Sequence, residues 1–148
     1  MVADFLTFRL DLTSALMIER ANAVYRAQWD LDVRTLRVLR LICTEAGITP
    51  KAVSQRALIE KTLLSKMLSQ LESRGLIGRQ AHPDDRRSLA LHPTPDGMAV
   101  ARDSARAGAE LEAELLTVLS DEERGALERT LTKLTRHLLP ADTPAAPC

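Results

Sequence analysis

Apolar residues recur at three- and four-residue steps over most of the chain, which is the spacing that places them on one face of an α-helix. This pattern predicts helices over residues 32–46, 61–73 and 95–119, and a last helix that begins after Ser120. Ser120 and Glu123 have the capping-box spacing that starts a helix. The chain is therefore expected to be mainly helical, and we expect no internal repeat.

The first segment, from Asp4 to about Gln28, is also predicted to be helical, with Asp4 as the N-cap, because it contains no Gly or Pro. Its apolar residues do not keep to one stripe. They follow two sides, with Phe5, Phe8, Leu12 and Leu16 on one and Leu6, Leu10, Met17, Ala21 and Val24 on the other. Such a helix needs burial on more than one side. A central core helix and a helix that packs against a second subunit both satisfy this pattern.

The middle of the chain has the pattern of a helix-turn-helix. A short helix is predicted to start with Thr49 as N-cap and Pro50 at the first helical position. A turn of about three residues, Leu58 to Glu60, separates it from a second helix over 61–73, which Gly75 ends. The buried stripe of this second helix is predicted to consist of Leu64, Met67, Leu68 and Leu71.

A charged β-hairpin is predicted to follow, with strands over residues 76–82 and 88–92. Leu89 and Leu91 alternate with smaller residues, which predicts a half-buried strand with both leucines on the buried face. Pro83, Asp84 and Asp85 supply the turn between the strands, and Thr94 with Pro95 begins the next helix. A helix-turn-helix followed by a hairpin is the order of a winged helix-turn-helix, so the fold class is mainly α (α+β).

Charge is distributed unevenly along the chain. The net charge is zero, but residues 51–92 hold eight Lys and Arg against four Asp and Glu, which leaves +4. A locally positive segment in a neutral chain is the electrostatic pattern expected of a nucleic-acid-binding surface.

We expect this segment to bind double-stranded DNA, because a helix fits the major groove and a cation on a hairpin tip fits the minor groove. The residues predicted to contact DNA from the second helix and its end are Lys61, Thr62, Leu63, Ser65, Lys66, Ser69 and Arg74. From the hairpin they are Asp85, Arg86 and Arg87, with Asp85 placed to orient an arginine through a charge-assisted hydrogen bond. A solvated helix face and an ordinary charged turn are the alternatives.

The run from Leu36 to Gly97 resembles the winged helix-turn-helix of the MarR family of bacterial transcriptional regulators. The matching motifs are LRVLRLI, EKTLLSKMLSQLESRGLIGR, the wing HPDDRRSLAL, and TPDG at the start of the next helix. The chain departs from the family in having Leu58 where Gly is frequent in the turn, and His92-Pro93-Thr94 where Leu-Thr is usual.

The resemblance implies one domain over residues 1–139, with a DNA-binding part at about 31–93 and dimerisation helices at about 4–28 and 95–139. Residues 140–148 are expected to form a disordered tail, being rich in Pro and Ala. The resemblance further implies a homodimer that binds a pseudo-palindromic operator, represses transcription, and releases DNA when a small aromatic or phenolic effector binds. The family's wing arginine and its aspartate partner correspond to Arg87 and Asp85.

An effector pocket is expected near the end of the first helix, with Tyr25, Arg26 and Trp29 as its candidate lining; junction packing is the alternative. Cys43 lies on an apolar stripe, which favours a packing role over redox sensing, although a cysteine-based redox regulator stays an alternative.

The last helix carries a leucine seam, Leu127, Leu131, Leu134 and Leu138, that also suits a protein-interaction module without specific DNA binding. The three histidines are scattered and form no catalytic or metal-ligand set, so we expect no enzyme, cofactor or metal. No apolar run approaches 18 residues, which excludes a membrane span, and we expect a cytoplasmic protein.

Overall fold

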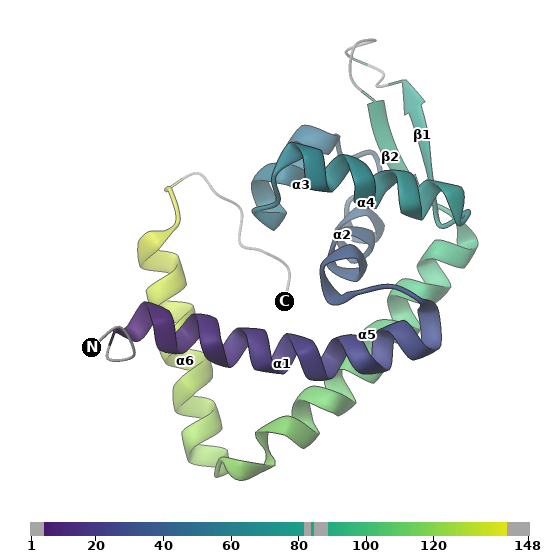
Figure 1. Ribbon diagram of the computed structural model, residues 1–148. Helices are drawn as coiled ribbons and strands as arrows, with labels where there is room; N and C mark the ends of the chain where they lie inside the picture. Colours follow the sequence, from purple (N-terminus) through teal and green to yellow (C-terminus); the bar gives the residue numbers. More distant parts are fainter. Residues whose placement is uncertain (1–4, 82–83, 85–88, 142–148) are drawn as a thin grey trace. The chain divides into compact units, whose positions relative to one another are not determined.

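The computed structural model of the chain describes residues 5–81, 84 and 89–141, and the mainly helical winged fold that the sequence predicts is confirmed (Figure 1). Its elements, in order, are α1 (Leu6–Trp29), α2 (Val33–Thr44), α3 (Pro50–Ala57), α4 (Lys61–Ser73), β1 (Ile77–Ala81), β2 (Leu89–Pro93), α5 (Pro95–Leu115), a 3-10 turn (Leu116–Val118) and α6 (Asp121–Leu138). The chain divides into two compact units, Met1–Gly108 and Ala109–Cys148.

The core of the first unit is built around α2, which contacts α1, α3, α4 and β2. Leu36, Leu39 and Ile42 are fully buried there, at the three- and four-residue steps that the sequence shows. The Asp32 side chain caps this helix by accepting a hydrogen bond from the Thr35 N–H at 2.8 Å. Gly47 then turns the chain away with a φ of +94°, in the left-handed region that favours glycine.

The boundaries of the first helix and of two others differ from the sequence prediction. α1 begins at Leu6, with Phe5 at the N-cap position and no side-chain capping bond; Asp4, the predicted cap, lies outside the described residues. α2 ends at Thr44 rather than Ala46, and α5 ends at Leu115 before a 3-10 turn rather than continuing to Leu119.

The helix-turn-helix is as the sequence predicts. The Thr49 hydroxyl accepts a hydrogen bond from the Ala52 N–H at 3.2 Å, which caps α3. The four predicted stripe residues of α4 are all buried: Leu64, Met67, Leu68 and Leu71. Burying this stripe turns the opposite face of α4 to solvent.

β1 and β2 form an antiparallel two-stranded sheet, in which Arg79 pairs with Leu91 and Ala81 with Leu89. Leu91 also forms a bridge with Ile48, so it has backbone partners on both sides and is fully buried. The predicted burial of Leu89 is wrong: it is 42% exposed, whereas Ala90 is buried. Leu89 lies two residues nearer the hairpin tip than the Ile48 bridge, beyond the part of the sheet that the core covers.

The second unit contains α6, whose capping box is confirmed by two reciprocal bonds. The Ser120 hydroxyl accepts from the Glu123 N–H at 3.1 Å, and the Glu123 carboxylate accepts from the Ser120 N–H at 2.9 Å. The leucines of the predicted seam are all exposed in the single chain, from 37% at Leu134 to 71% at Leu138. Among the described residues, no helix is long and apolar enough to cross a membrane.

Candidate nucleic-acid interface

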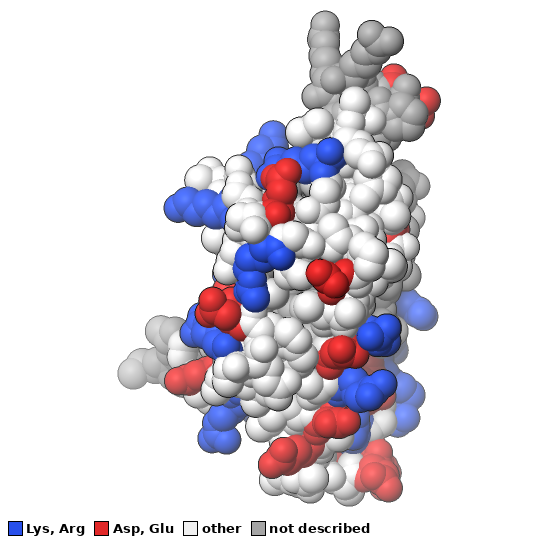
Figure 2. All heavy atoms as spheres, turned by 90° about the vertical axis from the view of Figure 1, so that its right-hand side faces the viewer, with Lys and Arg blue, Asp and Glu red and all other residues white. Residues whose placement is uncertain are grey.

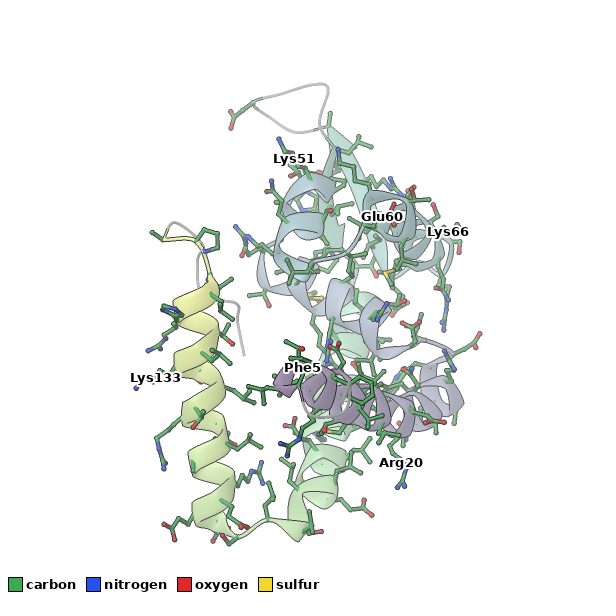
Figure 3. All side chains as sticks on the ribbon, turned by 60° about the vertical axis from the view of Figure 1, so that its left-hand side comes forward. Phe5, Arg20, Lys51, Glu60, Lys66 and Lys133 are labelled. Carbon is green, nitrogen blue, oxygen red and sulfur yellow. The ribbon has the colours of Figure 1, made fainter. Side chains whose placement is uncertain are left out.

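The exposed face of α4 carries six of the residues that the sequence predicts to contact DNA. All six side chains are exposed, and Leu63, the one apolar member, is 38% exposed. The set is Lys61, Thr62, Leu63, Ser65, Lys66 and Ser69. Figure 3 shows Lys66 projecting outward from the helix. Two cations and three short hydroxyl side chains on one helix face can reach phosphates and base edges.

Arg74, the seventh predicted contact outside the wing, follows the end of α4 and is exposed. Its Nη1 donates a hydrogen bond to the backbone carbonyl oxygen of Asp30 at 3.0 Å. Asp30 is the residue that ends α1, with a left-handed φ of +52°. Arg74 therefore ties the end of α4 to the end of α1, a contact that joins residues 44 positions apart and that periodicity does not reveal.

The tip of the wing lies mostly outside the described residues, and this includes Asp85, Arg86 and Arg87. The described part of the hairpin is fixed to the core through its base. The Gly47 N–H donates to the Leu91 carbonyl at 2.7 Å, and the Leu91 N–H donates to the Ile48 carbonyl at 2.9 Å. The hairpin is therefore anchored to the turn before α3, beside the helix-turn-helix.

The positive charge of residues 51–92 is reduced by ion pairs. Arg56 on α3 pairs with Glu45, and the Arg79 Nε donates to the Glu72 carboxylate at 2.9 Å. Lysines 51, 61 and 66 are exposed on the helix-turn-helix and make no ion pair that the described residues show. On the face drawn in Figure 2, basic and acidic side chains are interspersed. The described cations of this region that take no part in these ion pairs therefore lie on the helix-turn-helix.

The structure brings together two of the three residues predicted to line an effector pocket. Tyr25 is buried and Trp29 is half-buried, with ring centroids 5.9 Å apart, whereas Arg26 is exposed. Arg40 from α2, absent from the predicted set, lies over the Tyr25 ring with its guanidinium carbon 5.6 Å from the centroid.

Arg40 joins three helices through its side chain. Its Nη2 lies 3.1 Å from the buried Ser104 hydroxyl and 3.4 Å from the Tyr25 hydroxyl. Its Nε is buried and has no hydrogen-bond partner among the described residues. The cluster is tightly packed, since a Cβ added at Gly108 would lie 2.1 Å from the Tyr25 hydroxyl oxygen. This close packing favours the junction-packing interpretation of Tyr25 and Trp29.

Cys43 is half-buried, and its Sγ lies 3.9 Å from the Gly97 carbonyl oxygen. Burial raises the pKa of the Cys43 thiol, which keeps it protonated at neutral pH. Because the thiolate is the reactive form, this environment favours packing over redox sensing. Among the described residues, no group of three or more His, Cys, Asp and Glu could hold a metal ion.

A helix-turn-helix with an adjacent two-stranded wing defines the winged-helix class of DNA-binding folds. Residues 29–88 match the family model described as "MarR family". The multiple antibiotic resistance protein MarR of Salmonella typhimurium is 31% identical over 111 residues, which cover 74% of this chain and 77% of that protein. A Thauera aromatica transcriptional regulatory protein for an hcr operon is 32% identical over 108 residues, which cover 73% of this chain and 64% of that protein.

Solved structures agree with the sequence comparison. The apo form of wild-type MarR from E. coli superposes with a TM-score of 0.79 at 25% identity, over 88% of this chain and 96% of that chain. A cysteine-to-serine variant of E. coli MarR in complex with operator DNA gives a TM-score of 0.78 at 26% identity, over 87% and 92% of the two chains. The chain belongs to the MarR family of transcriptional regulators.

Proposed function

We propose that the protein is a homodimeric repressor that binds a pseudo-palindromic operator in double-stranded DNA. The observation that carries this proposal is the exposed face of α4, where Lys61, Thr62, Ser65, Lys66 and Ser69 lie opposite a fully buried stripe. A helix anchored in this way can enter the major groove as a rigid element, with the lysines at phosphates or a guanine and Leu63 at a thymine methyl group. The complex of a variant of E. coli MarR, 26% identical to this chain, with operator DNA supports DNA binding.

The wing supplies the second part of the proposed interface. Arg87 would enter the minor groove, with Asp85 orienting it and Arg86 beside it, because narrow minor grooves attract cations. The hairpin base that positions this tip is bonded to the turn before α3. Arg74 would contact phosphate with the donors that its bond to Asp30 leaves available.

The exposed apolar residues of α1 and α6 support a homodimer. Phe5, Leu6 and Leu16 in or next to α1 are each more than half exposed, and Leu131 and Leu134 of α6 are exposed at helical spacing. Exposed apolar stripes of this kind mark association surfaces. A dimer would place two copies of α4 in successive major grooves, about 34 Å apart.

Regulation by a small aromatic or phenolic effector is the finer part of the proposal. Tyr25 is closely packed against Arg40, so the effector would bind beside this cluster, at the half-buried Trp29 and the exposed Arg26 near the end of α1. An effector that binds the free protein would raise its thermal midpoint and release the operator. A thermal-shift screen of phenols and aromatic acids tests effector binding independently of DNA binding. Gel shift with each hit then tests whether the effector releases the operator.

In vitro selection from a random duplex library tests the function itself. We expect the wild-type protein to enrich a pseudo-palindrome whose half-sites are centred about 10 bp apart. Lys66→Ala should weaken binding to the selected duplex about tenfold, in line with the loss of one good contact. Lys133→Ala, which removes another exposed lysine, from α6, should leave binding unchanged (Figure 3).

The same experiment separates the two rival functions. If the protein retains no sequence above competitor DNA at moderate salt, the repressor proposal fails and a protein-interaction module is favoured. A redox regulator would bind the selected duplex and lose it on treatment with peroxide. Replacement of Cys43 by alanine would then abolish that loss.

A further inference from the structure

A small hollow lies where α3, α4 and β1 meet, and its lining comes from all three elements. Its volume is about 220 Å³. The residues that line it are Pro50, Lys51, Lys61, Leu64, Ser65, Leu68 and Arg79. Three of these seven are cations, contributed by three elements that are separate in sequence.

The hollow combines this positive charge with an apolar floor. The side chains of Leu64 and Leu68 are at most 2% exposed, whereas Lys51 and Lys61 are exposed at the rim of the hollow. Cations beside a low-dielectric wall attract anions more strongly than cations surrounded by water. The hollow therefore suits an anion with several acceptor oxygens.

Arg79 is held in place by a carboxylate. Its Nε donates to Glu72 Oε2 at 2.9 Å, and its side chain is 24% exposed. This bond uses one of the five N–H donors of the guanidinium and fixes the orientation of the others. Among the described acids near these cations in sequence, Glu72 pairs with Arg79 and Glu45 pairs with Arg56. Glu60 precedes Lys61, and Asp84 follows Arg79 by five residues. The described lining of the hollow holds Lys51, Lys61 and Arg79 and no acidic side chain, so these residues give it an excess of positive charge.

We propose that this hollow binds a phosphodiester of the DNA backbone, with Lys51 and Arg79 as phosphate contacts beside Lys61. The inference rests on the proposed function and extends its interface from α4 to α3 and β1. Lys61 and Ser65 belong both to the hollow and to the exposed face of α4. A helix in the major groove has phosphates along both edges of that groove, so docking α4 brings a phosphate to the hollow.

Such a contact holds the protein on DNA without distinguishing sequences. Phosphate contacts fix register and orientation, and each one released on dissociation adds to the salt dependence of binding. The loss of Lys51 should therefore weaken binding to the selected operator and to an arbitrary duplex by the same factor. An equal loss of affinity for both duplexes distinguishes Lys51 from a residue that contacts bases.

The test is the salt dependence of DNA binding, measured by fluorescence anisotropy with the selected operator and with an arbitrary duplex of equal length. For Lys51→Ala, the slope of log K against log salt should fall in magnitude by about 0.9 per lost contact, or about 1.8 for a dimer with two copies. Lys51→Arg should restore the slope, and Lys133→Ala should keep it unchanged. A wild-type slope in Lys51→Ala, with the wild-type protein binding DNA normally, overturns this inference and leaves the proposed function intact.

A free phosphate ion carries the same anionic oxygens as the DNA backbone and could also occupy the hollow. Titrations in potassium phosphate and potassium chloride at matched ionic strength distinguish it from the DNA backbone. If phosphate displaces DNA from the wild type more than chloride does while Lys51→Ala keeps the wild-type slope, the hollow binds free phosphate and the inference is wrong. A wild-type protein that binds neither duplex would refute the proposed function together with this inference.

Discussion

Gly97 stands at the contact between the start of α5 and the base of the wing. A Cβ placed there would lie 1.9 Å from the Leu76 carbonyl oxygen, a backbone atom. Two bonds hold the same junction: the Thr94 hydroxyl donates to the Gly75 carbonyl at 2.6 Å and accepts from the Gly97 N–H at 3.0 Å. The glycine of the TPDG motif is thus required by close backbone approach, not by the helix that it begins.

Gly97→Ala should lower the free energy of unfolding by about 3 kcal/mol, at the upper end of overpacking costs, because the clashing atom is backbone and cannot rotate away. Urea denaturation followed by circular dichroism measures this change. Gly78→Ala is the matched control, since a Cβ at Gly78 would meet no atom within 4 Å. Equal stability of the two variants would contradict the close contact.

Leu58 shows how the turn of the helix-turn-helix forms without glycine. Its φ is +53°, in the left-handed region that costs a non-glycine residue about 1–2 kcal/mol, and its side chain is 88% exposed. Two bonds offset this cost: the Ser54 hydroxyl donates to the Ile59 carbonyl at 2.6 Å, and the Ile59 N–H donates to the Ser54 carbonyl at 3.2 Å. Leu58 therefore adopts the left-handed conformation that glycine favours.

Arg40 marks the limit of what residue patterns can predict. In the sequence it lies on the polar side of its helix with Arg34 and Arg37, both of which are exposed. Its position over Tyr25 depends on residues 15 and 64 positions away in the chain. Periodicity within one helix carries no information on such distant partners. The sequence therefore named Tyr25 and Trp29 as candidate pocket residues but missed Arg40, which lies over the Tyr25 ring.

At the scale of elements, the starts of α3 and α6 were predictable because their caps are local, whereas α1 begins without a side-chain cap. The capping bonds join residues three positions apart, Thr49 with Ala52 and Ser120 with Glu123. The sequence pattern that predicts such a cap therefore contains both partners of the bond. The burial of Leu89 was not predictable, because it depends on how far the core extends along the hairpin. The bridge between Ile48 and Leu91, which are 43 positions apart, sets how far the core extends along the hairpin.

The wing is the element whose proposed role is most specific. Arg87→Ala should weaken binding to the selected operator by about 1–3 kcal/mol, or roughly 5- to 150-fold, because it removes a minor-groove contact. Gel shift against the selected duplex measures the loss. Arg87→Lys keeps the charge without the fork of donors, so it should recover non-specific affinity better than operator affinity. Full operator affinity in Arg87→Ala, with an unchanged thermal midpoint, would exclude the wing from the groove.

At the scale of the whole molecule, the two-sided first helix admitted both a core role and a subunit contact. Of its residues only Tyr25 is buried in the single chain, and its first half exposes Leu6, Leu12 and Leu16. The hydrophobic pattern of the helix could not distinguish the two roles, because it does not specify whether the same chain or a second subunit covers the apolar residues. The exposure in the single chain now favours the subunit contact.

The seam of α6 offers the sharpest test of that dimer. Leu131→Glu should convert a dimer into a monomer in sedimentation, because a carboxylate buried between apolar helices costs several kcal/mol. Operator affinity should fall with it, since two linked helix-turn-helix units bind far more tightly than one. Thr132→Glu adds the same charge one residue along, at an exposed position outside the seam, and should stay dimeric. If Leu131→Glu sediments like the wild type, α6 is not the dimer contact, and the spacing of the two α4 helices must be set by other residues.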